Sequence, residues 1–451
     1  MEQMTLEEIA GAVGSTTPIN GKTTVICTDT RKLAKGCVFI ALSGANFDGH
    51  DFVRDAFEAG AIAAITEHPV GKHPCIQVDN TRKALLDLAR YYRMKFSPVV
   101  AGVTGSVGKT TTKEMIALAL SAQYNTLKTQ GNLNNEIGLP LTLFQLDESI
   151  EAAVIEMGMS HFGEIHRLSK TARPTLAVIT NIGFSHLENL GSQEGILKAK
   201  LEILDGMDSS APLILNADDP LLAGVCLDRE IITYAIENET ADIRAVNLTL
   251  GERTEFDILH DRQSYHAQLN CIGRHNVLNA LAAFTAGVCS GIAPQSILDK
   301  LREYQPTGLR QRIEKRGEQT LLIDCYNASP DSMKAGLSML MQMQPETGGR
   351  RVAVLADMLE LGEMSPLLHE RVGQMAVDAG VDKLICYGEN ARYMARRADE
   401  LGLHSGSTTD RGMLLEYLRA SLKPGDVVLF KGSRGMRLEE VIEELYPKPC
   451  S

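Results

Sequence analysis

The stretch Val99-Val-Ala-Gly-Val-Thr-Gly-Ser-Val-Gly-Lys-Thr-Thr-Thr-Lys-Glu114 decides the fold of this chain. Residues 98–103 are apolar and mostly β-branched, which predicts a buried parallel strand, and the residues from Thr111 onward predict a helix. The glycines between them let backbone N–H groups approach phosphate oxygens, and the helix N-terminus adds a partial positive charge. A strand, a glycine loop and a helix in this order predict a nucleotide-phosphate site.

The loop itself supplies the groups that ATP and a metal ion require. We expect the charge of Lys109 to lie at the β- and γ-phosphates and the Thr110 hydroxyl to be a Mg²⁺ ligand. The usual spacing G-x-x-x-x-G-K-[ST] is not met, because Val103 stands five residues before Gly108, so the loop is a short variant. A glycine-rich turn without a ligand is the alternative, and the flanking strand and helix disfavour it. The expected nucleotide contacts here are Gly105, Ser106, Val107, Gly108, Lys109, Thr110 and Thr111.

Composition restricts the class of protein. The chain has 451 residues, enough for about three domains, and 44% of them are hydrophobic. The net charge of −12 argues against nucleic acid or an anionic membrane surface as the main partner. The acidic N-terminus resembles no signal peptide, and no apolar run is long enough to insert into a membrane. The nine cysteines are scattered without a C-x-x-C pair, as in reduced thiols of a cytoplasmic protein.

The chain divides into three α/β blocks. Residues 1–80 hold short strands, including one expected at 23–27, and a helix near 50–59. A helical pattern at 81–93 opens the middle block, 81–309, in which strands alternate with helices up to a helix at 276–288. Residues 310–451 begin a second series of alternating strands and helices, which predicts a second doubly wound parallel sheet.

Two further polar residues of the middle block follow strands. Glu156 ends the strand expected at 152–156, and His186 lies in the loop after the strand at 176–180. Carboxyl ends of parallel strands meet at one edge of a sheet, so both side chains can join Thr110 in a Mg²⁺ cluster. Taken alone, such an acid is often a solvated surface group and a lone loop histidine is usually structural.

Six motifs together resemble the Mur ligase family, the ATP-dependent amide-forming enzymes of peptidoglycan precursor synthesis. The resemblance covers essentially the whole chain, and the motifs stand in the order of the family. They are Thr104–Thr110, Gly131–Gly138, Val154–Gly158, Thr180–Gly183 with His186, Lys198–Lys200, and Gly273–Ala280.

Four other segments are similar to the branch of the family that adds D-Ala-D-Ala to UDP-MurNAc-tripeptide: Thr28–Arg31, Asn132–Asn135, Asp324–Met333 and Asp357–Gly362. The branch that adds a diamino acid carries an Asp-Asn-Pro-Arg motif in its third domain, and residues 310–451 contain none. The alternatives are that diamino-acid ligase, a folylpolyglutamate-type ligase, and a nucleotide-binding switch without ligase activity. The resemblance leaves open whether residue three of the tripeptide is lysine or diaminopimelate.

The resemblance implies a three-domain architecture. An N-terminal domain (1–80) would bind the UDP substrate, a central P-loop ATPase-like domain (81–309) would bind ATP, and a Rossmann-like C-terminal domain (310–451) would bring the dipeptide. It also implies two Mg²⁺ ions, held by Thr110, Glu156, His186 and a Lys200 that CO₂ has carbamylated. Asn276, Asn279 and Asp324 would contact the nucleoside. Either Arg310 or Arg312 would reach the phosphates, and spacing favours Arg310.

The same resemblance assigns substrate contacts. Thr30, Arg31 and Gly44 would hold the uridine diphosphate, and Asn132, Asn134 and Asn135 the nucleotide sugar. Asn327, Asp357, Lys431 and Arg434 are candidates for the dipeptide. The protein would act as a monomer, through an acyl phosphate that the third domain shields from water.

Overall fold

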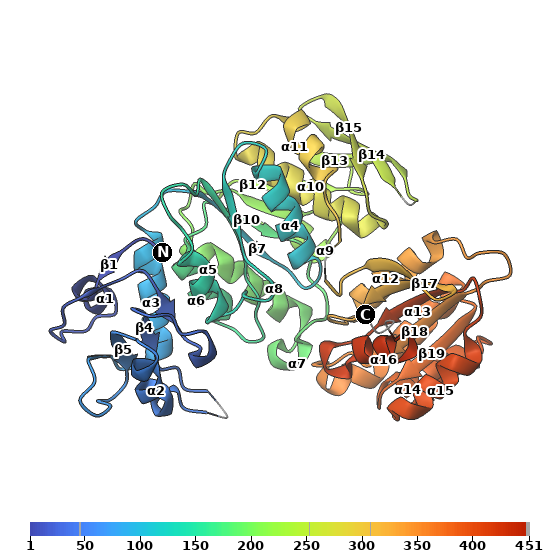
Figure 1. Ribbon diagram of the computed structural model, residues 1–451. Coiled ribbons are helices and arrows are strands. Elements are labelled where there is room, and N and C mark those ends of the chain that lie inside the picture. The colour runs from blue at the N-terminus through green and yellow to red at the C-terminus, as the bar shows by residue number, and fades with distance from the viewer. Residues whose placement is uncertain (45–46, 252, 307, 448–451) are drawn as a thin grey trace.

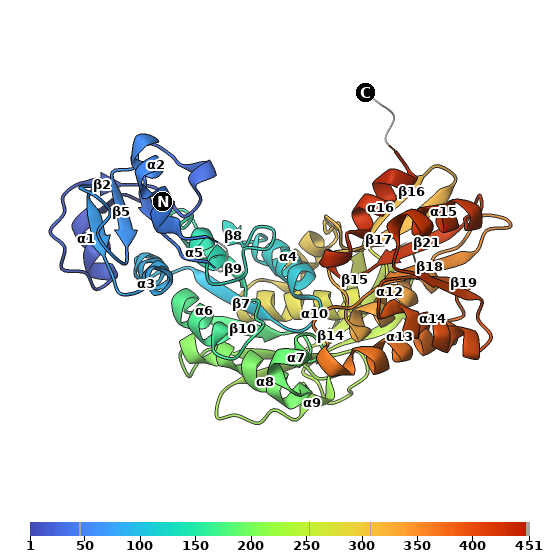
Figure 2. The same ribbon diagram turned by 90° about the horizontal axis from the view of Figure 1, so that it is seen from below.

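The computed structural model describes residues 1–44, 47–251, 253–306 and 308–447. Three domains follow one another along the chain, and the first and last lie on opposite sides of the middle one (Figures 1 and 2). Among the described residues, no helix combines the length and the apolarity needed to cross a bilayer. The ninth cysteine, Cys450, lies outside these residues, and the other eight are free thiols.

The N-terminal domain contains a four-stranded parallel sheet and a two-stranded antiparallel sheet. The first is formed by β3 (Ile26–Cys27), β4 (Val38–Ile40), β5 (Ala63–Thr66) and β6 (Cys75–Gln77), and the second by β1 (Met4–Thr5) and β2 (Lys22–Thr23). The helical segments are α1 (Leu6–Ala12), α2 (Val53–Glu58), η1 (Thr30–Lys32) and η2 (Gly49–Phe52).

The single strand expected at residues 23–27 is wrong, because the chain turns inside it. The Thr23 hydroxyl donates to the carbonyls of Val25 and Gly36 at 3.0 and 2.9 Å, and it accepts from the Val25 N–H at 3.0 Å. These bonds separate β2 from β3 and place the two strands in different sheets.

A nine-stranded sheet forms the middle domain, in the order β15-β14-β13-β12-β11-β10-β7-β9-β8. The parallel part consists of β7 (Val99–Thr104), β8 (Thr126–Lys128), β9 (Ala152–Glu156), β10 (Leu176–Ile179), β11 (Leu213–Asn216), β12 (Ile231–Ala235) and β13 (Ile243–Thr249). The last two strands, β14 (Thr254–His260) and β15 (Gln263–Leu269), run antiparallel to their neighbours. The sequence patterns did not predict strands β12 to β15.

Helices cover both faces of this sheet (Figure 1). One buried layer joins the sheet to α4 (Lys109–Leu120), α10 (Arg274–Cys289) and α11 (Pro294–Leu301). The other joins it to α3 (Thr81–Arg93), α5 (Gly138–Leu143), α6 (Glu164–Ala172) and α8 (Gln193–Leu201). The shorter segments are α7 (Leu187–Leu190), η3 (Glu202–Gly206) and α9 (Pro220–Ala223).

The C-terminal domain is a second α/β sandwich, with strand order β16-β17-β21-β18-β19-β20. Its strands are β16 (Arg312–Arg316), β17 (Gln319–Asp324), β18 (Arg351–Ala356), β19 (Lys383–Tyr387), β20 (Ser405–Thr408) and β21 (Val427–Lys431), and only β16 is antiparallel. One face packs on α12 (Pro330–Gln342), α13 (Ser365–Ala379) and α14 (Ala391–Glu400), the other on α15 (Arg411–Ser421) and α16 (Leu438–Leu445). Two short turns are η4 (Gly362–Met364) and η5 (Arg434–Met436).

Helix α3 connects the first two domains, and a buried arginine at its end fixes it to the middle one. Arg93 donates to the carbonyls of Ala172, Phe96 and Arg173 at 2.8, 2.9 and 3.3 Å. The first and last of these carbonyls lie at the C-terminal end of α6, where the backbone has no further helical donors. Burial lowers the pKa of Arg93, yet its carbonyl partners still solvate the charge.

We predict that Arg93→Met lowers the free energy of unfolding by about 2–4 kcal/mol, because three carbonyls lose their donor in a buried place. Arg90→Met, which changes an exposed position of the same helix, serves as the control and is expected to stay within about 0.5 kcal/mol of wild type. Chemical denaturation of both variants measures the difference. Equal stability of the two variants would contradict the role of Arg93 in fixing α3 to the middle domain.

Candidate functional site

The glycine loop between β7 and α4 is held in a conformation that other residues cannot adopt. Gly105 has φ +152°, and a Cβ there would lie 1.9 Å from the Thr180 hydroxyl oxygen. Gly108 is left-handed, with φ +85°. Asn181 supports the loop, because its side-chain oxygen accepts from the Val107 N–H at 2.9 Å and its amide donates to the Val107 carbonyl at 2.8 Å. The loop is therefore preformed around backbone donors.

Lys109 begins α4 and folds over the loop. Its Nζ donates to the carbonyls of Gly105 at 2.7 Å and Ser106 at 3.2 Å. Burial lowers the pKa of Lys109 to about 8, and the positive charge of Arg310 acts in the same direction. The negative charge of Glu156 acts in the opposite direction. A phosphate group beside this ammonium would favour the charged form, so the position suits a polyphosphate ligand.

Glu156, at the end of β9, is a buried carboxylate with incomplete hydrogen bonding. Its Oε1 accepts from the Thr110 hydroxyl at 3.2 Å and from the Asn134 amide at 2.8 Å. Its Oε2 accepts no hydrogen bond from any described residue and lies 3.9 Å from Lys113 Nζ. A buried carboxylate oxygen with spare acceptor capacity, next to a hydroxyl, fits the ligand set of Mg²⁺.

The other two expected metal ligands are placed differently. His186 has φ +62° and its Nδ1 lies 2.6 Å from Glu360 Oε2 of the C-terminal domain, a contact that holds the pKa of Glu360 below its usual range. Lys200 of α8 is 2% exposed and pairs with no carboxylate among the described residues. Burial and then the charge of Lys109 lower the pKa of Lys200 well below its ordinary value. No group of three acidic, histidine or cysteine side chains in the described ranges is arranged as a metal site.

Three cavities converge next to the glycine loop. The first, of about 400 Å³, extends from Arg82 near the N-terminal domain past Glu156 to His186. The second, of about 250 Å³, contains the loop itself. The third, of about 590 Å³, lies between α4 and residue Arg434. Arg310 lines all three, and its guanidinium stacks 4.1 Å from the centre of the Tyr326 ring.

The second cavity gathers most of the residues expected to bind ATP. It is lined by Ser106, Val107, Gly108, Lys109, Thr110, Thr111, Asn279 and Asp324. Asn276 lies behind Asn279 and accepts from its amide at 3.2 Å. Lys431 is also here, paired with Asp324 at 2.5 Å. The structure thus puts Lys431, which the sequence suggested for the dipeptide, in the same cavity as the phosphate loop.

The expected substrate residues are divided among the cavities. Asn134, Asn135 and Asn327 line the first cavity, whereas Asn132 and Arg434 line the third. Asn135 also has a structural task, because its side chain accepts from the Gly138 N–H at 2.9 Å at the start of α5.

Several candidates line none of these cavities. Thr30, Arg31 and Gly44 lie on the N-terminal domain, and the exposed Arg31 guanidinium forms two hydrogen bonds with Asp29. Asp357 is buried and accepts from the N–H groups of Asn390 and Ala391 at the start of α14. Arg312 pairs with Glu314 on the edge strand β16, so Arg310 is the arginine that reaches the cavities.

Sequence reasoning assigned no role to three residues that the structure brings into the site. Lys113 contacts Glu156 and is 1% exposed, and its position one helical turn after Lys109 was a signal for it. Tyr326 lies under Arg310, and Arg82 enters the first cavity from α3. Nothing local in the sequence indicates Arg82, because its place depends on how two domains pack.

Comparisons with known proteins agree with this geometry. Three family models match: the Mur ligase family catalytic domain over residues 22–93, the Mur ligase middle domain over 103–287, and the Mur ligase glutamate ligase domain over 311–434. The UDP-N-acetylmuramoyl-tripeptide–D-alanyl-D-alanine ligase of Bacillus subtilis is 41% identical over 438 residues, with 94% of each chain covered. The chain belongs to the Mur ligase family.

Solved structures resemble this Mur ligase over its whole length. A crystal structure of MurF from Acinetobacter baumannii has a TM-score of 0.93 at 30% identity and covers 99% of this chain and 100% of its own. MurF from Thermotoga maritima, solved in complex with ADP, has a TM-score of 0.84 at 29% identity, with 94% and 97% covered. The three-domain α/β architecture expected from the sequence is therefore confirmed.

We predict that Gly105→Ala weakens ATP binding about 100-fold or more, because the added Cβ displaces Thr180, whose hydroxyl holds the Val107 carbonyl at 2.6 Å. Gly291→Ala is the control, since Gly291 has φ +80° with open space around it. Nucleotide titration by calorimetry measures both affinities. An affinity of the Gly105 variant within threefold of wild type would contradict the proposed role of the loop.

Proposed function

We propose that this Mur ligase uses ATP to join D-Ala-D-Ala to UDP-MurNAc-tripeptide. The observation that carries the proposal is the convergence of three cavities on Arg310, beside the phosphate loop, as a ligase with three substrates requires. The names of curated relatives at 37–41% identity over more than nine tenths of the chain support the choice of substrates. We also propose that the protein acts as a monomer and that the reaction takes place in the cytoplasm, where ATP is available.

The reaction has two steps. The terminal carboxylate of the tripeptide attacks the γ-phosphorus of ATP, so that an O–P bond forms, ADP leaves and an acyl phosphate results. The amine of the dipeptide then attacks the acyl carbon and loses a proton, and the C–O bond to phosphate breaks to leave an amide. Phosphoryl transfer depends mainly on positioning and charge neutralisation, which are the tasks of Lys109 and Arg310.

Thr110 and Glu156 would hold Mg²⁺, and the spare acceptor capacity of Glu156 supports this fit. The metal would supply positive charge to the phosphate oxygens. His186 would complete the set after release from Glu360, and it already lines the same cavity as Glu156.

The C-terminal domain contributes Arg310 and closes the site against water. Its Asp331 carboxylate accepts from the Phe184 N–H at 3.3 Å, and its Arg371 guanidinium lies 5.7 Å from the centre of the Phe184 ring. Together with the pair of His186 and Glu360, these contacts hold the domain on the loop after β10. Such closure would protect an acyl phosphate from hydrolysis.

Binding of the UDP moiety falls to the N-terminal domain in this proposal. Thr30, Arg31 and Gly44 would contact the diphosphate and uridine. The exposed guanidinium of Arg31 now donates to Asp29, and it could donate to a phosphate group in its place. Asn134 and Asn135 would hold the sugar and peptide in the first cavity.

Lys200 would be carried as a carbamate. A neutral amine attacks CO₂, forms a C–N bond and releases one proton, and burial of Lys200 beside Lys109 favours that neutral amine. The resulting carboxylate would carry charge opposite to that of Lys109 and would support a second Mg²⁺.

We expect phosphate release from ATP and UDP-MurNAc-tripeptide to depend on D-Ala-D-Ala, with product confirmed by mass spectrometry. Free lysine or diaminopimelate offered with the UDP-MurNAc-dipeptide should give at least about 1000-fold less product, because a site built for a dipeptide leaves polar groups unpaired. Preference for the diamino acid would assign the chain to the sister ligase. Nucleotide binding without turnover on either substrate pair would indicate a switch.

Lys200→Ala should be nearly inactive and partly rescued by formate or acetate, because a small anion can occupy the vacated space and restore negative charge. Lys200→Arg should resist rescue, since its side chain fills the space and stays cationic. Lys198→Ala, at an exposed position of the same helix, should keep wild-type activity. The rescue is measured from the initial rates of the three variants across a series of formate or acetate concentrations. Full activity of Lys200→Ala without added anion would disprove carbamylation of Lys200.

A further inference from the structure

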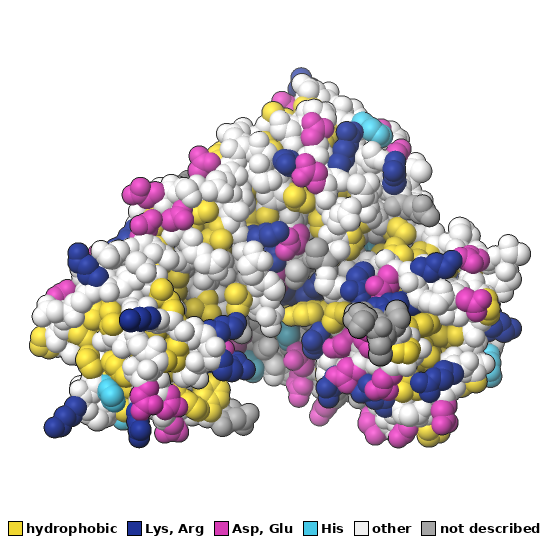
Figure 3. All heavy atoms as spheres, viewed as in Figure 1, with side chains coloured by type: hydrophobic (Ala, Val, Ile, Leu, Met, Phe, Trp, Pro, Cys, Tyr) yellow, Lys and Arg dark blue, Asp and Glu magenta, His cyan; other side chains and the backbone are white. Residues whose placement is uncertain are grey.

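The first cavity contains more carboxylates than the reaction uses. The molecule is hollowed between the N-terminal and C-terminal domains, and basic and acidic side chains lie along this hollow (Figure 3). The middle-domain wall of the cavity includes the end of β9, residues 158–160 and part of α6. Besides Glu156, the carboxylates of Glu136 and Glu164 line it. These two acids differ in the partners that the protein gives them.

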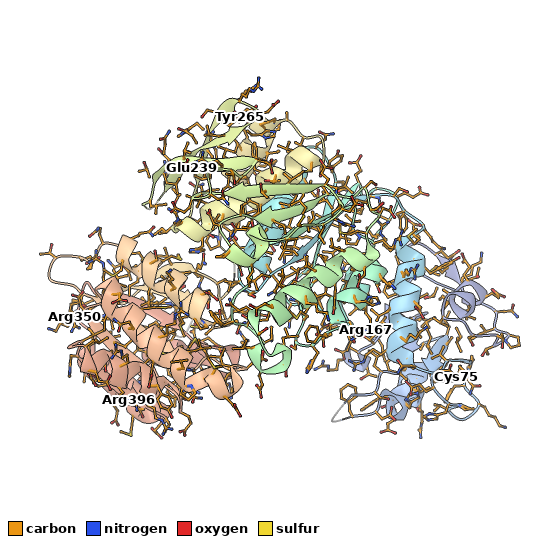
Figure 4. All side chains as sticks on the ribbon, turned by 180° about the vertical axis from the view of Figure 1, so that it is seen from behind. Cys75, Arg167, Glu239, Tyr265, Arg350 and Arg396 are labelled. Atoms are coloured by element: carbon orange, nitrogen blue, oxygen red, sulfur yellow. The ribbon has the colours of Figure 1, made fainter. Side chains whose placement is uncertain are left out.

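Glu136 has two arginine partners. Arg167 of α6 pairs with its Oε1, and a guanidinium nitrogen of Arg82 of α3 lies 4.0 Å from its Oε2. Arg167 lies where α6 passes beside α3 (Figure 4). The Glu136 side chain is only 16% exposed, so its charge is already balanced by residues of the protein.

Glu164 has no lysine or arginine partner among the described residues. Its Oε2 accepts from the backbone N–H groups of Ser160 at 2.7 Å and His161 at 3.4 Å, which fixes the carboxylate at the start of α6. Its Oε1 lies 3.6 Å from Nδ1 of His161, which is too far for a hydrogen bond. One carboxylate oxygen of this cavity therefore keeps its capacity to accept hydrogen bonds from a ligand.

Apolar side chains accompany this carboxylate. Ile137, Met159 and Leu168 line the same cavity, and Leu168 lies one turn after Glu164 on the same face of α6. An alkyl chain that ends in an ammonium group fits this combination. Its methylene groups pack on apolar side chains, and the ammonium donates charged hydrogen bonds to a carboxylate.

We propose that Glu164 binds the amino group at the end of the side chain of residue three of UDP-MurNAc-tripeptide. The inference rests on the proposed function, in which the peptide occupies the first cavity. Lysine and diaminopimelate both carry this amino group at the end of an alkyl chain, so Glu164 serves either residue.

The chemistry of the substrate restricts where such a pocket can lie. The carboxylate that attacks ATP and the side chain of residue three are attached to the same carbon atom. The pocket for that side chain must therefore adjoin the place where the phosphate is transferred. Glu164 meets this condition, because it lines the same cavity as Lys109 and Glu156. The segment that connects Glu156 to Glu164 forms the wall between them.

Glu164→Gln removes the charge and keeps a side-chain oxygen that accepts from the Ser160 N–H. We expect it to raise the KM for UDP-MurNAc-tripeptide about 20-fold, because a charged hydrogen bond to this substrate is lost. The KM values for ATP and D-Ala-D-Ala should stay within twofold of wild type. The rise should appear with lysine and with diaminopimelate as residue three, and initial rates of phosphate release measure it.

A tripeptide with norleucine as residue three supplies the second probe, because norleucine has an alkyl side chain without the amino group. The wild-type enzyme should use it about 20-fold less efficiently than the lysine tripeptide, measured as kcat/KM. Glu164→Gln should scarcely distinguish the two, since the group that reads the ammonium is gone. A substitution that only disturbed α6 would lower both rates and leave their ratio unchanged.

Glu7→Gln is the control. Glu7 is an exposed acid in the first turn of α1, so the change is chemically the same and lies outside the cavity. Its kinetic constants and its preference for the lysine tripeptide should match wild type.

Other results would overturn the inference. Equal use of the lysine and norleucine tripeptides by the wild-type enzyme would show that no carboxylate reads the amino group. An unchanged preference for lysine in Glu164→Gln would show that another residue reads it. Failure of the wild-type enzyme to form product from any of these tripeptides with D-Ala-D-Ala would instead refute the proposed function, so the two failures are distinguishable.

Discussion

The site is organised around one buried carboxylate. Glu156 is 1% exposed, and a charge removed from water to that extent requires partners. The protein supplies them from two segments: Thr110 and Lys113 from the first turns of α4, and Asn134 from the segment after β8. Satisfying this single charge therefore fixes the end of β9 relative to the start of α4 and to the segment after β8.

The sequence was most informative where a function depends on neighbouring residues. The strand, loop and helix at 99–120 and the acid at the end of β9 were predicted because hydrophobic pattern and glycine position are local signals. The edge of the sheet was missed, since the strands β13 to β15 are partly exposed, pair with one another in antiparallel fashion and lack the continuous apolar pattern of buried strands.

Residues whose role depends on distant partners were harder to place. Lys431 is the last residue of one strand of the C-terminal sheet and Asp357 directly follows another. The sequence could not tell that Lys431 would pair with Asp324 and that Asp357 would accept hydrogen bonds at the start of α14. The sequence left open whether Arg310 or Arg312 reaches the phosphates. The structure distinguishes them, because Arg310 lines the cavities and Arg312 pairs with Glu314. Tertiary contacts, both within the C-terminal domain and between domains, carry this information, and they leave no periodic trace in the chain.

The arginine that ties α3 to α6 has a consequence for how the molecule moves. Arg93 fixes α3, the helix that connects the N-terminal and middle domains, to α6, whereas the C-terminal domain is connected through a single covalent segment that includes Gly308 and the left-handed Gln311. Rotation about that segment would carry Arg310, Tyr326 and Arg434 together. The second and third cavities both take residues from the rotating part, Asp324 and Lys431 in the second and Tyr326 and Arg434 in the third. Docking of the C-terminal domain therefore completes both cavities in a single movement.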